Sequence, residues 1–396
     1  MKKLVVVLVS IAAMINISDC FGQDSTWQRT FDFTAYNNYD LRNSSQNFIS
    51  AFRAIDDGFY ALVKPMKPVP QNISKAVFNF ASIYLTMIWS HEMGHYFRAE
   101  QVGGHFYIHD FGIPIPYTTV ELPDDISLTD EALFVTAGFE VNYLNIRTLQ
   151  SQFVRQNGLW NPDLALSFAN RLMYPIYTSL VVPINPEDPN VWVDPAGDPI
   201  FFVLPVFKNY TNKDIFMPDG SVNPELIKLY NQAAIFATFF QFADPQFYRE
   251  VGAAFGKASK IRRPIFLIGD YNTGWTYGTL FNASPLGYEL YMQNYLHINN
   301  RQYGLYLKYG RPFQNIGLGF SMNEILKFGD FYADVLAEIW QQDIFGSGAS
   351  LEFSGKWKLS KHLGINFNLG YKTEGYVLGK QLNAGANLGA GITFYR

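Results

Sequence analysis

The feature that most constrains this chain is a strict alternation of apolar and polar side chains near its C-terminus. Residues 351–359 read Leu-Glu-Phe-Ser-Gly-Lys-Trp-Lys-Leu, and residues 365–372 read Ile-Asn-Phe-Asn-Leu-Gly-Tyr-Lys. Residues 384–394 repeat the pattern with small side chains. Successive side chains of a β-strand point to opposite faces of the sheet, so the pattern predicts strands with one apolar and one polar face.

Similar segments, separated by turn-like sequences, begin at about residue 265. They include residues 288–292, 303–309, 316–322 and 331–339, with a less regular strand expected within 265–281. We expect about eight antiparallel strands in residues 265–396, the smallest number found in membrane β-barrels. Aromatic side chains near strand ends and the final Phe394-Tyr395 pair, although followed by Arg396, favour an outer-membrane barrel over a soluble barrel or sandwich with a polar exterior.

The N-terminus predicts export from the cytoplasm. Met1-Lys2-Lys3 is followed by a short apolar region and then by Cys20-Phe21-Gly22. This order is typical of a secretory signal peptide, here residues 1–22, with cleavage after Gly22. Lipidation of Cys20 is the alternative, although Asp19 fits that signal poorly. Cleavage after Gly22 leaves no cysteine, so a bound metal would need histidine and carboxylate ligands.

Residues 23–264 read mostly as helices. We expect helices at 45–63, 71–101, 128–154, 162–180 and 224–242, with a Pro- and Asp-rich loop at 183–199. None contains the roughly 18–20 apolar residues that a membrane-spanning helix needs. The predicted fold is therefore α+β: a mostly helical, zincin-like domain over residues 23–264, followed by a barrel over residues 265–396. The 30 basic and 34 acidic residues give no indication of a nucleic-acid partner.

The second expected helix carries His91-Glu92-Met93-Gly94-His95, the HExxH pattern of zinc hydrolases. Residues four apart lie on one face of a helix, so His91 and His95 can bind one Zn²⁺ ion. Glu92 could then take a proton from zinc-bound water. The alternative is three exposed polar residues on a soluble helix. The preceding apolar residues 87–89 argue against it, because buried polar side chains are costly unless a metal binds them. Gly94 leaves room for a neighbouring segment.

A catalytic zinc site usually has a third protein ligand. Glu140 is the preferred candidate because it is the only acid in the apolar stretch 132–144, where a carboxylate needs a cation. A solvent-facing Glu140 is the alternative. The competing candidates are Asp198, Asp219, His105 and His109. Asp219 is more simply explained as part of a turn.

Residues 91–104, HEMGHYFRAEQVGG, resemble the HExGH-xxx-A-xxx-G segment of the site-2 protease family of intramembrane zinc proteases. Residues 106–116 could form the β-hairpin that follows it there, and residues 137–142 match the AGPxxN segment except at Phe139. The resemblance covers residues 77–149. It implies zinc bound by His91 and His95, Glu92 as base, and Asn142 near the active site. The family's third ligand is an Asp before a Gly, as in Asp219-Gly220, but the family's spanning helices are missing here.

Together these features predict an exported, zinc-dependent metallopeptidase anchored in the bacterial outer membrane, with its catalytic domain in the periplasm. It would hydrolyse a peptide or protein with a zinc-activated water, with Asn142 as a donor to the oxyanion. The expected partners are that substrate and outer-membrane lipid. The alternative is a non-enzymatic outer-membrane barrel protein whose helical domain is a plug or a partner-docking module. A hydrolase acting on another amide, as in the cell wall, is a third possibility.

Overall fold

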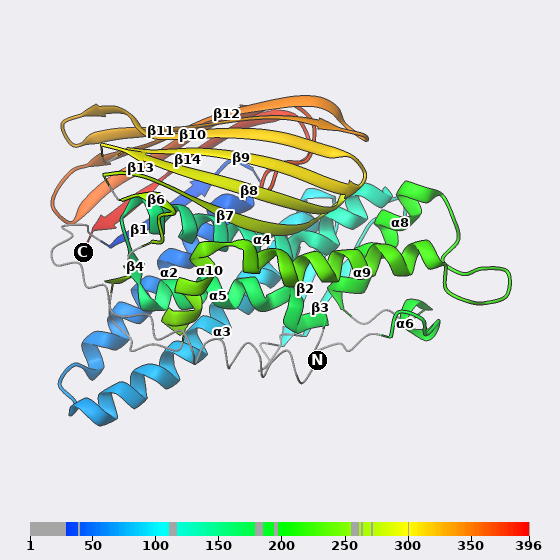
Figure 1. Cartoon of the computed structure of the whole chain (residues 1–396), viewed down its shortest axis with the longest axis horizontal. Coiled ribbons are helices and arrows are strands. Elements are labelled where there is room, and N and C mark those ends of the chain that lie inside the picture. The colour runs from blue at the N-terminus through cyan, green and yellow to red at the C-terminus, as the bar shows by residue number, and fades with distance from the viewer. Residues whose placement is uncertain are drawn as a thin grey trace.

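The computed structural model describes residues 29–38, 40–110, 117–178, 185–193, 197–254, 261–262, 264–270, 272–299 and 301–395. The predicted signal peptide, residues 1–22, lies outside these ranges. The fold is α+β, as predicted, with helices in the N-terminal part and an antiparallel sheet in the C-terminal part. The helices lie together below the sheet in Figure 1.

The long helices are α2 (Leu41–Val63), α3 (Pro68–Gln101), α4 (Leu128–Arg155), α5 (Asn161–Ile176) and α9 (Pro224–Phe239). The short ones are α6 (Asn190–Val193), α7 (Asp198–Phe201), α8 (Val203–Thr211), the 3₁₀ helix η2 (Phe240–Ala243) and α10 (Pro245–Ala254). Among the described residues, no helix is both long and apolar enough to span a membrane.

Several helices start at residues whose side chains cap the free backbone N–H groups of the first turn. The Asp40 side chain accepts a hydrogen bond from the backbone N–H of Arg42 at the start of α2. Ser127 accepts one from Asp130 at the start of α4, and Asn223 accepts one from Glu225 at the start of α9. Local sequence therefore determines these boundaries.

The main sheet has ten antiparallel strands in the order β1-β14-β13-β12-β11-β10-β9-β8-β7-β6. Its strands are β1 (Thr30–Tyr36), β6 (Ile268–Gly269), β7 (Thr273–Ser284), β8 (Gly287–Ile298), β9 (Arg301–Pro312), β10 (Asn315–Phe328), β11 (Phe331–Gln342), β12 (Gly346–Lys358), β13 (Leu363–Lys372) and β14 (Gly385–Tyr395). Two small sheets pair β2 (His105–Asp110) with β3 (Tyr117–Glu121), and β4 (Leu159–Trp160) with β5 (Ile261–Arg262).

The predicted closed barrel is not formed, because the described sheet has open edges at β1 and β6. Helices occupy the space between these edges: β1 packs against α2, α2 packs against α4, and α4 packs against β7. The sheet curves over α4 (Figure 1). The strands and helices thus share one core, in which Phe139 of α4 and Phe281 of β7 belong to the same buried cluster.

Strand β1 was not predicted and lies in the region expected to be helical. It pairs with β14 along its whole length, from Thr30 opposite Tyr395 to Tyr36 opposite Gly389. Its seven residues, TFDFTAY, alternate like the C-terminal strands. Phe33 points outward and Asp32 is buried. This alternating segment is short and lies far from the others in the sequence, so it was not predicted as a strand of the sheet.

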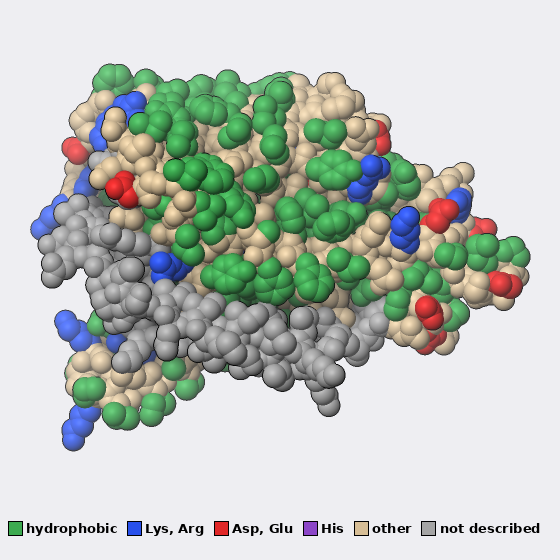
Figure 2. Space-filling view, viewed as in Figure 1, with side chains coloured by type: hydrophobic (Ala, Val, Ile, Leu, Met, Phe, Trp, Pro, Cys, Tyr) green, Lys and Arg blue, Asp and Glu red, His purple; other side chains and the backbone are tan. Residues whose placement is uncertain are grey.

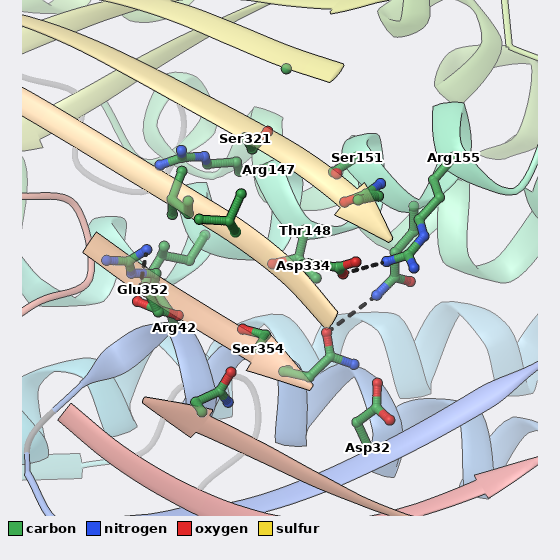
Figure 3. A pocket seen from close by; sticks show the side chains of 18 of the residues that line it. Asp32, Arg42, Arg147, Thr148, Ser151, Arg155, Ser321, Asp334, Glu352 and Ser354 are labelled. Atoms are coloured by element: carbon green, nitrogen blue, oxygen red, sulfur yellow. Dashed lines mark hydrogen bonds and ion pairs between the residues drawn. The ribbon is translucent and has the colours of Figure 1, made fainter. Parts of the chain in front are cut away.

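The sheet is apolar on its exposed face and polar on its buried face. On β12, Leu351, Phe353 and Trp357 are 45%, 38% and 53% exposed, whereas Glu352, Ser354 and Lys356 between them line a cavity beneath the sheet. Figure 2 shows the apolar side chains gathered over the sheet. A polar cavity of about 340 Å³ lies beneath the sheet, and Figure 3 shows its charged lining. In it Arg155 forms an ion pair with Asp334 at 2.8 Å.

Candidate metal centre

The HExxH residues lie on the second half of α3, where this helix crosses α4. Gly94 makes the crossing possible, since a Cβ there would lie 2.4 Å from the backbone oxygen of Ala137. The neighbouring segment for which Gly94 was expected to leave room is therefore α4. His91 and His95 face this helix and are only 3% and 5% exposed.

Both histidine rings are oriented by a hydrogen bond at Nδ1. His91 Nδ1 lies 2.8 Å from Oδ1 of Asn142, and His95 Nδ1 lies 3.0 Å from the backbone oxygen of Phe134. Both partners are acceptors, so each Nδ1 carries a proton and each Nε2 is the ring nitrogen available to a metal ion. Such partners are typical of metal-binding histidines.

The third residue at this site is Asp198. Its Oδ2 lies 2.8 Å from His91 Nε2 and 3.3 Å from His95 Nε2, and the two Nε2 atoms are 3.3 Å apart. A tetrahedral zinc ion with bonds of about 2.0–2.1 Å would place its ligand atoms about 3.3 Å apart. His91, His95 and Asp198 therefore form a group that could hold a metal ion.

Asp198 reaches the histidines because the chain turns sharply just before it. Gly197 has a φ of +92°, and a Cβ at this position would lie 2.7 Å from the ring of Tyr177. Asp198 then begins the short helix α7, and Ile200 and Phe202 anchor the segment in the core. Asp198 is one of the candidate ligands in the sequence, but its approach to the histidines is not visible there, because Gly-Asp-Pro is also a common loop sequence.

The same site requires a residue without a side chain at Gly138 on α4. A Cβ at Gly138 would lie 2.4 Å from Nε2 of His91, so a side chain cannot share this space with the ring. The Ala137-Gly138 pair, noted for its resemblance to a family motif, thus has a packing explanation in this protein. The backbone of Ala137 packs against Gly94, and the missing side chain of Gly138 leaves space for the His91 ring.

Glu140, the preferred third ligand, is not part of this group. It is fully buried, and both of its oxygens accept hydrogen bonds from Arg98, with distances of 2.9 to 3.1 Å. The Tyr376 hydroxyl and the Gly379 N–H also donate to it, at 3.2 and 2.6 Å. The prediction that the buried carboxylate needs a cation was right, but the cation is a guanidinium group on α3.

The other candidates also lie elsewhere. Asp219 is an exposed turn residue whose Oδ1 accepts hydrogen bonds from the N–H and hydroxyl of Ser221, as its turn sequence indicated. The His105 side chain is 67% exposed, and His109 lies 2.5 Å from the Thr119 hydroxyl. Both histidines belong to β2 and are not part of the group around His91.

Asn142 lies next to the histidines, as the resemblance implied, but its amide is already engaged. Its Oδ1 accepts from His91, and its Nδ2 donates to Oδ1 of Asn170 at 2.8 Å. Asn145 donates to the same Asn170 oxygen at 3.1 Å, and all three amides are buried. Asn142 therefore orients His91, and its expected role as an oxyanion donor is not supported.

Glu92 lies beside the hairpin formed by β2 and β3. The Thr118 hydroxyl of β3 donates to Oε2 of Glu92 at 3.4 Å. Phe106 of β2 lies nearly parallel to the His95 ring, with centroids 6.4 Å apart. A hairpin was expected after the motif, but it extends to Glu121, and residues 111–116 lie outside the described ranges.

The charges of the site are coupled. Burial would lower the pKa of His95, but Asp198, with help from Glu92 and the Phe134 carbonyl, raises it to about 9. Burial would raise the pKa of Asp198, but the two histidines hold it well below its usual range. Burial, Asp198 and Glu92 all raise the pKa of Tyr177, so its hydroxyl remains a hydrogen-bond donor.

Comparison with known proteins adds no identification. No family model matches the chain, and no curated protein or solved structure matches it. The site must therefore be interpreted from its own geometry.

Proposed function

We propose that this protein is a zinc-dependent metallopeptidase held in the bacterial outer membrane by its β-sheet. The observation that carries the catalytic part is the convergence of three ligand atoms that lie 2.8 to 3.3 Å apart. Two of them belong to buried histidines whose Nδ1 atoms already have hydrogen-bond partners. A structural role alone would not require two Nε2 atoms to face each other across so short a distance.

A bound zinc ion would supply a Lewis acid and would lower the pKa of a coordinated water towards about 7. Glu92 follows His91 directly and is only partly buried, so it can take a proton from water and pass it to the leaving amine. Tyr177, which interacts electrostatically with Asp198 and Glu92, replaces Asn142 as the candidate donor to a developing oxyanion.

The exposed face of the sheet supports the membrane part of the proposal. Strands β7 to β14 contain 10 to 14 residues each, and a tilted strand needs about 9–11 to cross the hydrocarbon layer. Exposed rings occur near both ends of this face: Phe328, Trp357 and Phe394 at one end, and Tyr309 and Tyr371 at the other. Aromatic rings at two levels are typical of a protein whose apolar belt faces lipid.

The experiment is to replace Glu92 with Gln in the full chain. We expect the variant to retain zinc at one ion per chain and to lose peptide hydrolysis, because the ligands remain and the base is lost. The matched control is Glu100→Gln on the same helix, which should keep both properties. Hydrolysis by Glu92→Gln at the wild-type rate would refute the proposed mechanism. Absence of zinc from the wild-type protein would favour the non-enzymatic alternative.

A further inference from the structure

The turn between α2 and α3 extends away from the rest of the protein. Figure 1 shows this helical hairpin projecting from the end of the molecule where the C-terminus lies. Its two helices pack on each other: the rings of Phe59 and Phe78 stack at 3.8 Å, and Lys75 Nζ lies 3.8 Å from the centre of the Tyr60 ring. Gln71 also donates to backbone oxygens at the end of α2. The hairpin is therefore held by its own contacts.

The outer side of this hairpin carries a continuous apolar stripe. On α3, Val69, Ile73, Val77 and Phe80 are 69%, 60%, 66% and 77% exposed. Their spacing of three and four residues places them on one helix face. Leu62, near the end of α2, is 77% exposed as well. Isolated exposed apolar residues are common, but a stripe of this kind indicates an interaction surface.

The charges of the hairpin are of one sign. Between Asp57 and Glu92 the chain has no acidic residue, and its charged residues there are Lys64, Lys67 and Lys75. Lys75 is buried against Tyr60, whereas Lys64 and Lys67 are exposed at the turn. Figure 2 shows basic side chains beside apolar ones at the projecting tip. An apolar stripe flanked only by lysines complements the apolar interior and negative surface of an anionic lipid leaflet.

We infer that the α2–α3 hairpin, residues 61–81, inserts its apolar stripe into the boundary between headgroups and acyl chains of a bilayer that contains anionic phospholipid. Lys64 and Lys67 contact the lipid phosphates. This inference goes beyond the proposed function, because it depends neither on the metal centre nor on the sheet. It gives the protein a second membrane contact on helices.

The test uses the full chain with Cys20→Ser, so that an introduced cysteine is the only one. A polarity-sensitive fluorophore is attached at Val77→Cys on the stripe, at Asn72→Cys on the adjacent polar edge of α3, or at Leu318→Cys on the exposed face of β10. Each protein is reconstituted into vesicles of phosphatidylcholine, with or without phosphatidylglycerol, whose acyl chains carry bromine as a quencher. We expect strong quenching at Val77 and weak quenching at Asn72.

Replacing Lys64 and Lys67 with Gln should lower the ratio of inserted to free hairpin in vesicles that contain phosphatidylglycerol. The expected loss is about fivefold for each lysine. In vesicles of phosphatidylcholine alone, the same change should have little effect. An equal loss in both kinds of vesicle would overturn the role of anionic lipid.

Equal quenching at Val77 and Asn72 would overturn the inference. Energy transfer between labelled copies in place of quenching would show that the stripe binds a second copy, which also overturns it. The Leu318 label separates the two membrane proposals. Quenching at Leu318 alone would leave the sheet in the membrane and refute the hairpin contact, whereas quenching at Val77 alone would support the hairpin and refute the embedded sheet.

Discussion

The third ligand of the proposed zinc site can be tested by removing one carboxylate at a time. Asp198→Asn keeps the shape of the side chain and removes its charge, and Glu140→Gln does the same on α4. The structure predicts opposite results, because Asp198 faces His91 Nε2 at 2.8 Å whereas Glu140 forms an ion pair with Arg98 at 2.9 Å.

The first substitution should mainly change zinc affinity, and the second should mainly change the free energy of unfolding. A site with four protein ligands binds zinc with about 10–16 kcal/mol, so one ligand contributes on the order of 3 kcal/mol. Asp198→Asn should therefore weaken zinc binding about a hundredfold. It should destabilise the metal-free fold less than Glu140→Gln does, because the Asp198 side chain is 20% exposed. Glu140→Gln should leave zinc affinity nearly unchanged. It should destabilise the fold by about 3–5 kcal/mol, because the fully buried Arg98 guanidinium loses its counter-ion.

Zinc affinity is measured by competition with a chromophoric chelator, and stability by urea unfolding of the metal-free protein in detergent. Affinity is determined only where the folded fraction is complete, so that a loss of stability cannot imitate a loss of binding. Asp219→Asn is the matched control and should change neither quantity, since Asp219 is an exposed turn residue. The reasoning is refuted if Glu140→Gln remains folded and loses zinc while Asp198→Asn retains it.

Two further predictions concern the crossing of α3 with α4 and a second buried carboxylate. Gly138→Ala should sharply reduce the zinc content measured by mass spectrometry, because its Cβ would lie 2.4 Å from His91 Nε2, whereas Gly58→Ala on α2, where a Cβ meets nothing within 4 Å, should leave it unchanged. Normal zinc content in Gly138→Ala would contradict the packing at this crossing. Asp163→Asn should destabilise the protein at pH 7 by about 3–5 kcal/mol, since Asp163 is buried between Arg53 and Arg29 at 3.1 and 3.2 Å. Burial would raise the pKa of Asp163, but the two arginines outweigh burial and lower it, so its stabilising effect is complete above about pH 4 and is lost as the pH falls further. The difference in unfolding free energy between the two proteins should accordingly shrink below pH 4, and a constant difference would contradict this assignment.

Local patterns predicted most of the individual elements. The helix at 128–154 is observed at Leu128–Arg155, the alternating segment 351–359 lies in β12 up to Lys358, and the segment 365–372 lies within β13. These elements follow from side-chain periodicity and capping residues, which act over a few neighbouring positions. The HExxH pattern likewise placed His91 and His95 on one helix face without knowledge of the rest of the fold.

The assembly of these elements depended on contacts between residues far apart in the sequence. Periodicity indicated strands, but it did not show that β1 pairs with β14. It also did not show that the sheet stays open and that α2 and α4 pack between its edges. It also could not show which face of the sheet is exposed. That face is set by α4, which covers the polar side and leaves the apolar side bare.

The amino-acid sequence specifies the chemistry available to the site: two histidines and a glutamate on one helix, with a carboxylate to be supplied from elsewhere. Which carboxylate this is depends on the folded chain. A buried acid can be neutralised by any cation within reach, and for Glu140 that cation is Arg98, 42 positions earlier in the chain. Asp198 is brought to the histidines, more than a hundred positions away, by the turn at Gly197 and its packing on Tyr177. Sequence patterns record side-chain type and local spacing, whereas pairing of buried charges depends on distances that only the folded chain defines.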